Sequence, residues 1–172
     1  MNGSGVDDMQ ATDADDETAA EPQPHTVNNN DLKRIWKLIE TTETNGQEIR
    51  SLIRAPKEEP FGLQWEVDVA MAVLSPLSQR WNIEICSALY IGGPERFNNL
   101  KGLLSGISSR TLSDKLTSLS GEGYVTRSVE EGPPVKTLYS LTNKGMRVGR
   151  LLGNLVAYLK MDEGYVVTTT EE

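Results

Sequence analysis

The sequence predicts a mainly α-helical fold with a small β-hairpin, preceded by a helical extension. Between residues 92 and 141, a short apolar helix, a glycine turn and a second helix opened by serines precede two strand-like segments. A Gly-Pro-Pro tip separates the two strands, and apolar residues at helical spacing flank the whole unit. This order is that of a winged helix-turn-helix, which places one helix in the DNA major groove and a hairpin near the adjacent backbone.

Length and charge bound the organisation. A chain of 172 residues has room for one domain with extensions. The net charge of −8 is unevenly spread: residues 1–59 hold six Lys or Arg and thirteen Asp or Glu, residues 60–161 eleven and eight, and residues 162–172 only four acids. The central segment is mildly basic, which suits phosphate contacts, although the acidity of the whole chain weakens a nucleic-acid function without excluding it.

Several classes of protein are disfavoured. The sequence holds no apolar run long enough to span a membrane, and its acidic N-terminus is the opposite of a secretory signal. The single cysteine, Cys86, allows no internal disulfide. We therefore expect a soluble, cytoplasmic protein without membrane contact.

The N-terminal region divides into a tail and an extension. Residues 1–29 hold almost no large apolar groups, so we expect a disordered acidic tail. Residues 30–59 predict a helical extension and linker, with Asp31 as a helix cap and a break at Asn45-Gly46. Pro56 ends the second helical piece.

Residues 60–161 predict the folded domain, and residues 162–172 an acidic C-terminal tail. A helix starts near Trp65 and is interrupted either at Pro76 or at Ser78-Gln79. Trp81 opens the next helix, which Gly92-Gly93-Pro94 stops.

The helix-turn-helix follows. Phe97, Leu100 and Leu104 mark a short helix, and Gly106 makes the turn. Ser108 fits an N-cap, with Ile107 and Leu112 as a hydrophobic staple. The buried face of this second helix is formed by Leu112, Leu116 and Leu119.

Two strands and a last helix complete the domain. Residues 124–129 and 135–141 predict a hairpin, and Thr142 caps a helix with more apolar residues than its own core requires. Such a surface predicts a two-fold partner. The expected dimerisation residues are Leu151, Leu152, Leu155, Val156 and Leu159. We expect the helical extension to add to this interface.

From Asp68 to Leu159 the chain resembles the HxlR-type winged-helix transcription regulators. The resemblance rests on Trp81 before an apolar helix, Gly93-Pro94 with Arg96-Phe97-Asn98-Asn99-Leu100, Gly106-Ile107-Ser108 with Leu112-Ser113, Gly123-Tyr124-Val125 with Arg127, Pro133-Pro134, and Tyr139-Ser140-Leu141-Thr142 with Gly145. It implies a homodimer that binds palindromic operators and represses or activates nearby genes, with a dimer surface formed by the helices at the two ends of the domain. Asp68 stands where many members carry a sensing cysteine, the wing spacing differs by about one residue, and the N-terminal extension lies outside the pattern.

Three groups of residues are candidates for DNA contact. The start of the second helix suits base edges and phosphates, the preceding helix suits phosphates, and the wing strands suit the adjacent backbone. The candidates are Ser108, Ser109, Arg110, Thr111, Ser113 and Lys115; Arg96, Asn98, Asn99 and Lys101; and Arg127, Lys136 and Thr137. Glu130 and Glu131, at the wing tip, would be repelled by phosphate.

Each candidate has a simpler alternative. Ser108 is also explained as a cap, and Arg110 as an ion-pair partner of Asp114 one turn along the helix. The polar residues of the preceding helix also suit a solvated face. Cys86 is interpreted as a core residue rather than a sensor, and the three tryptophans as packing residues rather than an effector pocket.

The sequence favours a binding protein over an enzyme. It lacks a phosphate-binding glycine loop and a nucleophile elbow, and His25 has no second metal ligand near it. We therefore predict a homodimeric, sequence-specific DNA-binding transcription regulator with no cofactor or metal. The alternative is a winged helix that docks on transcription or replication machinery, which the acidic tails favour and the serine-rich helix start opposes. The sequence does not indicate an effector.

Overall fold

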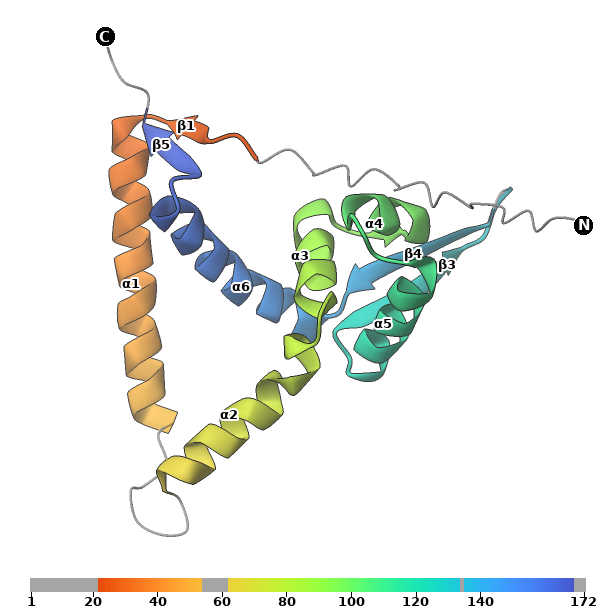
Figure 1. The fold of residues 1–172 in the computed structure, drawn as a ribbon, viewed down its shortest axis with the longest axis horizontal. Helices are drawn as coiled ribbons and strands as arrows, with labels where there is room; N and C mark the ends of the chain where they lie inside the picture. Colours follow the sequence, from red (N-terminus) through yellow and green to blue (C-terminus); the bar gives the residue numbers. More distant parts are fainter. Residues whose placement is uncertain (1–21, 54–61, 134, 169–172) are drawn as a thin grey trace, which may run out of the picture.

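A computed structural model describes residues 22–53, 62–133 and 135–168 (Figure 1). Helices dominate, as the sequence predicts. The helices are α1 (Asn29–Ile53), α2 (Leu63–Ser78), α3 (Asn82–Gly92), α4 (Phe97–Leu103), α5 (Ser109–Gly121) and α6 (Asn143–Asp162). The strands are β1 (His25–Val27), β2 (Glu95–Arg96), β3 (Val125–Glu130), β4 (Lys136–Leu141) and β5 (Val166–Thr168). In the described part of the chain, no helix is both long and apolar enough to cross a membrane.

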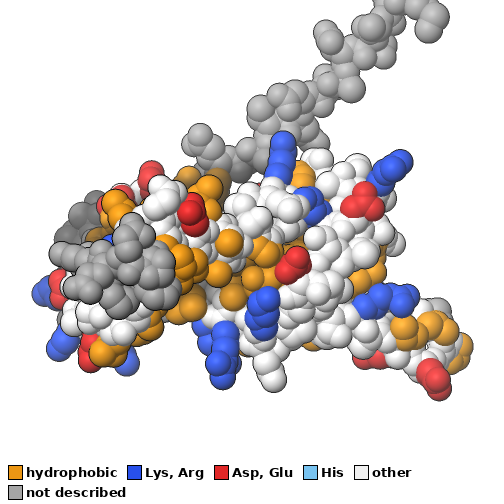
Figure 2. Space-filling model, turned by 90° about the horizontal axis from the view of Figure 1, so that it is seen from below, with side chains coloured by type: hydrophobic (Ala, Val, Ile, Leu, Met, Phe, Trp, Pro, Cys, Tyr) orange, Lys and Arg blue, Asp and Glu red, His pale blue; other side chains and the backbone are white. Residues whose placement is uncertain are grey.

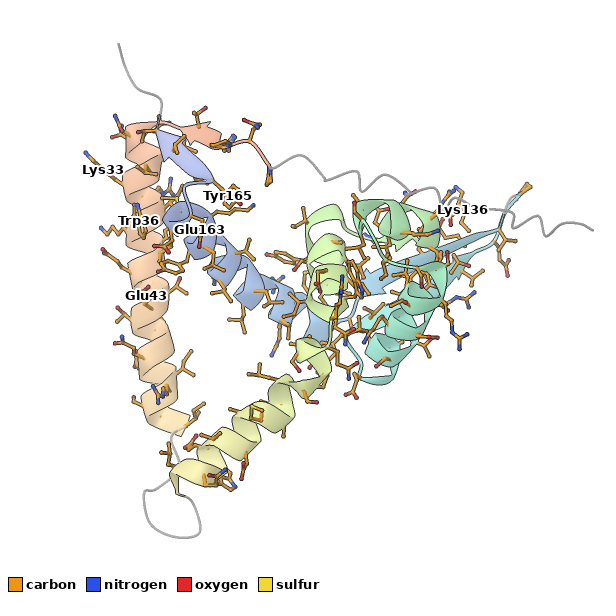
Figure 3. The ribbon with its side chains drawn as sticks, in the orientation of Figure 1. Lys33, Trp36, Glu43, Lys136, Glu163 and Tyr165 are labelled. Carbon is orange, nitrogen blue, oxygen red and sulfur yellow. The ribbon has the colours of Figure 1, made fainter. Side chains whose placement is uncertain are left out.

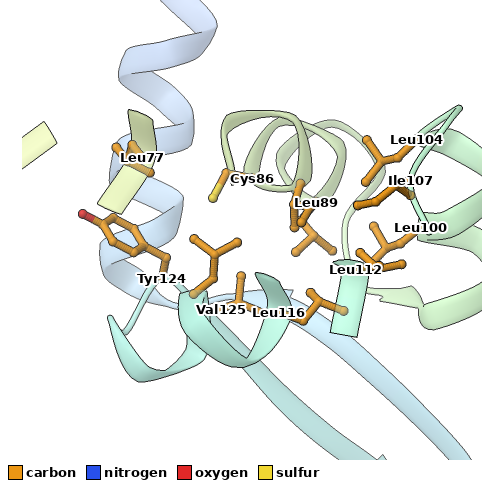
Figure 4. Packing of buried hydrophobic residues seen from close by; sticks show 12 residues of the cluster. Leu77, Cys86, Leu89, Leu100, Leu104, Ile107, Leu112, Leu116, Tyr124 and Val125 are labelled. Carbon is orange, nitrogen blue, oxygen red and sulfur yellow. The ribbon is translucent and has the colours of Figure 1, made fainter. Parts of the chain in front are cut away.

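The hydrophobic core lies between α3, α4, α5 and the start of β3 (Figure 4). Leu112, Leu116 and Leu119 of α5 are almost completely buried, which confirms the predicted inner face of that helix. Leu100 of α4 and Cys86 of α3 are fully buried in the same cluster. The core therefore fixes the two helices of the helix-turn-helix relative to each other.

Local signals at the helix ends are confirmed. The backbone N–H of Thr111 donates to Ser108 Oγ at 3.0 Å, and that of Gly145 donates to Thr142 Oγ1 at 3.1 Å, so both hydroxyl residues are N-caps. Gly106 has a φ of +85°, a conformation that glycine adopts without the steric cost of a side chain. The turn between α4 and α5 thus depends on that glycine.

The wing belongs to a three-stranded antiparallel sheet with the order β2-β4-β3. β3 and β4 form the predicted hairpin, in which Val125 pairs with Leu141 and Glu130 with Lys136. The third strand, β2, was not predicted, because its two residues are too short for a period-two pattern. It joins the start of α4 to the base of the wing.

Helix α1 differs from the prediction at both its start and its middle. Its cap is Asn28 rather than Asp31, since Asn28 Oδ1 accepts a hydrogen bond of 2.8 Å from the backbone N–H of Asp31. The helix also runs unbroken through Asn45-Gly46. An internal glycine costs only about 1 kcal/mol relative to alanine, which is small beside the cooperativity of a 25-residue helix. Pro56 lies outside the described residues.

The two ends of the described chain pair with each other. β1 and β5 form a parallel two-stranded sheet in which His25 pairs with Val166 and Val27 with Thr168. The prediction of disorder was therefore wrong for residues 25–27, and most of the tail it proposed, residues 1–21, lies outside the described residues. A strand also occurs within the predicted acidic C-terminal tail, at residues 166–168. Pairing of segments so distant in sequence leaves no local signal.

The junction between α2 and α3 fixes the direction of α2. The α2 helix continues past Pro76 and ends at Ser78, so the second of the two predicted interruptions is correct. Asn82 is buried and its Nδ2 donates to the carbonyl oxygen of Pro76 at 2.6 Å. Trp81 caps α3 in a left-handed conformation, with a φ of 77°, and its ring packs on the core beneath the Arg80 guanidinium.

Glycines allow α6 to approach α3 closely. A Cβ on Gly149 would lie 2.7 Å from Cδ2 of Tyr90, and one on Gly153 would lie 3.2 Å from Cε1 of the same ring. A Cβ on Gly145 would meet the backbone oxygen of Tyr124. One edge of α6 is therefore bare of side chains so that the Tyr90 ring can lie against the helix backbone.

Candidate nucleic-acid interface

The helix-turn-helix consists of α4, the Gly106 turn and α5. Leu100 is fully buried and Phe97 packs against the core, as predicted for both. Ile107 and Leu112 are buried on either side of the Ser108 cap, which agrees with the predicted staple. These contacts present the first turn of α5 and the polar face of α4 to the outside.

The first turn of α5 offers both side chains and backbone donors. Ser108 is committed to its cap, and its Oγ also shares a hydrogen bond of 2.8 Å with Thr111 Oγ1. Ser109, Arg110 and Ser113 are exposed, and their side chains make no hydrogen bond to another described residue. A helix N-terminus with exposed hydroxyl and guanidinium groups is suited to phosphates and base edges.

Arg110 and Lys115 differ in how they are held. Both Arg110 and Asp114 are described, and no ion pair joins them, so the structure does not show the pair that the sequence offered as an alternative. Lys115 is half-buried and its Nζ donates to Gln79 Oε1 at 2.9 Å. This bond ties α5 to the end of α2 and leaves Arg110 as the more accessible cation of the helix.

The second group of candidates runs from Arg96, the N-cap of α4, to Lys101 in the last turn of that helix. Asn99 Nδ2 donates to Glu95 Oε2 at 2.9 Å, so this side chain is engaged within its own turn. Arg96, Asn98 and Lys101 are exposed. The structure therefore fits both the predicted phosphate contacts and a solvated face.

The wing carries the third group of candidates. Arg127 Nη2 donates weakly to Thr137 Oγ1, at 3.4 Å, across the hairpin. Lys136 is exposed at the start of β4, directly opposite Glu130. Figure 3 shows Lys136 on the wing, at the opposite end of the molecule from Lys33 and Trp36 of α1. The helical extension is thus remote from the wing tip.

Further cations, which were not predicted as DNA contacts, are exposed near α5 and on α6. Arg80 is exposed beside Gln79, the residue that binds Lys115, so it lies close to α5. Arg147 and Arg150 are exposed on α6. Lys144, by contrast, donates to the backbone oxygen of Glu122 and covers the Tyr124 ring at 4.0 Å. In the sequence, Arg80 is marked only by its position next to Trp81, and that position does not predict a DNA contact.

The remaining candidates have other surroundings. Cys86 is completely buried in the core, as predicted, and this burial raises the pKa of its thiol to about 11. Among the described residues, no group of three or more His, Cys, Asp or Glu side chains is placed to hold a metal ion. Trp81 packs on the core, whereas Trp36 and Trp65 remain more than a third exposed.

The chain is similar to known regulators of transcription. It is 39% identical over 79 residues to the uncharacterised HTH-type transcriptional regulator YvaP of Bacillus subtilis (strain 168), a match that covers 46% of this chain and 72% of YvaP. It is 32% identical over 87 residues to the HTH-type transcriptional regulator YodB of the same organism, covering 51% of this chain and 77% of YodB. The crystal structure of ytcD, described as an HTH-type transcriptional regulator, superimposes with a TM-score of 0.50 and 26% identity over 55% of this chain and 95% of that one.

A family model matches the same region. Residues 76–164 match the HxlR-like helix-turn-helix model, which spans α3 to α6 with the wing and includes the exposed start of α5. Both of these relatives are named as HTH-type transcriptional regulators. The chain therefore belongs to the HxlR-like helix-turn-helix family of DNA-binding transcription regulators.

Proposed function

We propose that this regulator binds a specific operator as a homodimer, with α5 in the major groove and the wing beside the neighbouring backbone. The observation that carries the proposal is the exposed first turn of α5, where the side chains of Ser109, Arg110 and Ser113 make no hydrogen bond or ion pair to another described residue. In this arrangement Arg110 reads a guanine through two hydrogen bonds, and Ser109 binds a phosphate together with the helix N–H groups.

The other candidates position the protein on DNA. Arg96, Asn98 and Lys101 supply phosphate contacts from α4, and Lys136 and Arg127 supply them from the wing. Contacts of this kind are insensitive to base sequence and weaken as salt increases. Glu130 and Glu131 are both exposed at the wing tip, so the tip itself is kept from lying on a phosphate.

The homodimer is supported by the apolar surface of α6. Leu151, Leu155 and Leu159 are all exposed, and Leu151 retains 70% of its accessible surface. An uncovered row of leucines on a helix favours a partner. A two-fold axis would present two α5 helices to half-sites roughly 34–36 Å apart, or a multiple of that spacing.

The test is selection of bound fragments from genomic DNA, followed by titration of the selected site with single variants. Arg110→Ala should weaken specific binding by about 1–3 kcal/mol while leaving non-specific binding nearly unchanged. Arg50→Ala, an exposed arginine of α1, is the matched control and should bind like the wild type. Unaltered specific affinity of a folded Arg110→Ala protein would exclude base reading by this residue, and failure to select any fragment would favour a role in protein docking.

A further inference from the structure

Three consecutive residues, Gln79, Arg80 and Trp81, join α2 to α3 beside α5. Gln79 Oε1 accepts a hydrogen bond of 2.9 Å from Lys115 Nζ, and Lys115 belongs to the second turn of α5. Arg80 is the next residue along the chain, and consecutive Cα atoms lie about 3.8 Å apart. The junction therefore brings Arg80 to the flank of α5 that carries Lys115.

Arg80 stands on a rigid base. Its guanidinium carbon lies 4.9 Å from the centroid of the Trp81 ring, and that ring packs on the hydrophobic core. Asn82 holds the backbone of the junction: its N–H donates to the carbonyl oxygen of Gln79 at 3.1 Å, and its Nδ2 donates to that of Pro76 at 2.6 Å. A side chain that is already held in place loses less conformational entropy when it binds a ligand, so Arg80 is prepared for binding.

The positive charges of Arg80 and Lys115 are not neutralised within the described part of the chain. Neither side chain forms an ion pair with another described residue, although Glu84 and Asp114 are close to them in the sequence. Gln79 offers Lys115 only a neutral amide oxygen, and the other donors of the ammonium group remain free for an anion. Two unpaired cations on one flank of α5 suit the oxygens of phosphate groups.

The side of the molecule that holds α5 is accessible to a large anion. Figure 2 views the molecule from below, the side on which α2 and α5 lie in Figure 1, and several Lys and Arg side chains project there into solvent. Arg80 itself is exposed, and Lys115 is half-buried. A polyanion such as DNA can therefore reach both cations.

The position of α5 in the major groove decides which part of the DNA meets this flank. The groove is about 12 Å wide, and a helix with its side chains is about 10–12 Å across, so α5 fills the groove. The outer side of α5, with Arg110, then faces the base edges, and its flanks face the phosphate backbones that border the groove. Lys115 and Arg80 lie on one flank and are therefore directed to phosphates rather than to bases.

We propose that Arg80 binds a DNA phosphate beside α5, and that Gln79 is a positioning residue that holds Lys115 against the same stretch of backbone. This inference rests on the proposed placement of α5 in the major groove, and it adds the α2–α3 junction to the contacts from α5, α4 and the wing. The guanidinium of Arg80 suits this role because its planar fork can bind phosphate oxygens in pairs while its face stays on the Trp81 ring.

Titration of the selected operator and of an unrelated duplex, each over a range of salt concentrations, tests Arg80. Arg80→Ala should weaken binding to both duplexes about 5- to 10-fold at 0.1 M salt and lower the salt slope by about one, the contribution of one phosphate contact. Arg80→Lys keeps the charge and should restore most of the slope, although it loses the planar fork. Arg50→Ala, an exposed arginine of α1, is the matched control and should bind like the wild type.

A double-mutant cycle tests Gln79. Gln79→Ala leaves the charge of the protein unchanged, so a loss of DNA affinity reports the positioning of Lys115. The substitution should weaken binding about 2- to 5-fold in the wild-type background and have no effect in the Lys115→Ala protein. Gln79 and Arg80 are both exposed, so these variants are expected to fold, and circular dichroism verifies this.

The outcomes separate the junction contact from the proposed function. A protein that selects no DNA fragment overturns the proposed operator binding, and the junction contact with it. Specific binding that Arg110→Ala weakens, but that Arg80→Ala leaves at wild-type affinity and salt slope, overturns only the contact of Arg80. Additive effects of Gln79→Ala and Lys115→Ala overturn only the positioning role of Gln79. A reduced slope of Arg80→Ala that Arg80→Lys restores, together with coupling between Gln79 and Lys115, supports the whole inference.

Discussion

Alanine at position 149 would place its Cβ 2.7 Å from Cδ2 and 2.9 Å from Cγ of Tyr90. Carbon atoms in favourable contact lie about 3.5–4.0 Å apart, so the helix or the ring must move by several tenths of an ångström. The atoms that would collide belong to the root of the side chain rather than to a flexible end. Overpacking of this kind costs typically about 1–3 kcal/mol.

The helical preference of alanine works in the opposite direction. In an exposed helix interior, glycine to alanine gains about 1 kcal/mol. We therefore expect Gly149→Ala to lower the free energy of unfolding by up to about 2 kcal/mol, because the cost of the collision exceeds the gain in helical preference. Gly46→Ala in α1 isolates the favourable effect, since a Cβ there meets nothing within 4 Å, and it should stabilise the protein by about 1 kcal/mol. Gly153→Ala, at 3.2 Å from the ring, should fall between them.

Urea unfolding at one fixed protein concentration measures the series, because a dimer's stability depends on concentration. Tyr90→Ala combined with Gly149→Ala serves as the second half of a double-mutant cycle. Without the ring, the alanine at 149 should cost nothing. A Gly149→Ala protein as stable as Gly46→Ala would refute the argument that Tyr90 requires the bare edge of α6.

The remaining predictions concern binding and the thiol. Lys136→Ala should weaken specific and non-specific DNA binding alike and flatten the salt dependence, in contrast to Arg110→Ala; equal slopes for both variants would contradict this division. Diamide should leave DNA affinity unchanged, since Cys86 is buried and its thiol has a pKa raised from 9.0 to about 11. Because of the same shift, the thiol ionises at a lower pH in the unfolded chain than in the folded one. The free energy of unfolding should therefore fall as pH rises from 9 to about 11, and it should fall less over this range in Cys86→Ala than in the wild type. Removing residues 1–21, whose segment 7–21 holds seven acids and no base, should tighten non-specific DNA binding at low salt if the tail competes for the basic surface. Identical binding of both lengths would leave the tail a solubilising role.

Much of the domain was predictable because its signals are local. The Ser108 and Thr142 caps, the Gly106 turn and the leucine spacing of α5 each act within one or two helical turns, and the structure confirms them. The exposed start of α5 is predictable for the same reason. The Ser108 cap fixes where the helix begins, and the leucine spacing fixes which side is buried, so the opposite side must be exposed. The candidate residues of the wing followed from the hairpin in the same way.

Some predictions failed because weak local rules competed with longer-range effects. Asn45-Gly46 did not break α1, since the cost of one glycine is small beside the cooperativity of a 25-residue helix. The segment at residues 25–27 reads as unstructured but gains a partner strand more than a hundred residues away. The Lys115–Gln79 bond likewise joins residues whose proximity no spacing rule indicates.

The sequence by itself determined the helix-turn-helix, its caps, its inner leucines and the family to which the chain belongs. Only the tertiary structure decided that α1 lies along α6, that α2 is left uncovered, and that Gly149 faces Tyr90. The physical reason is that periodicity states which side of a helix is apolar but not which helix covers it. That choice depends on the summed packing of surfaces distant in sequence.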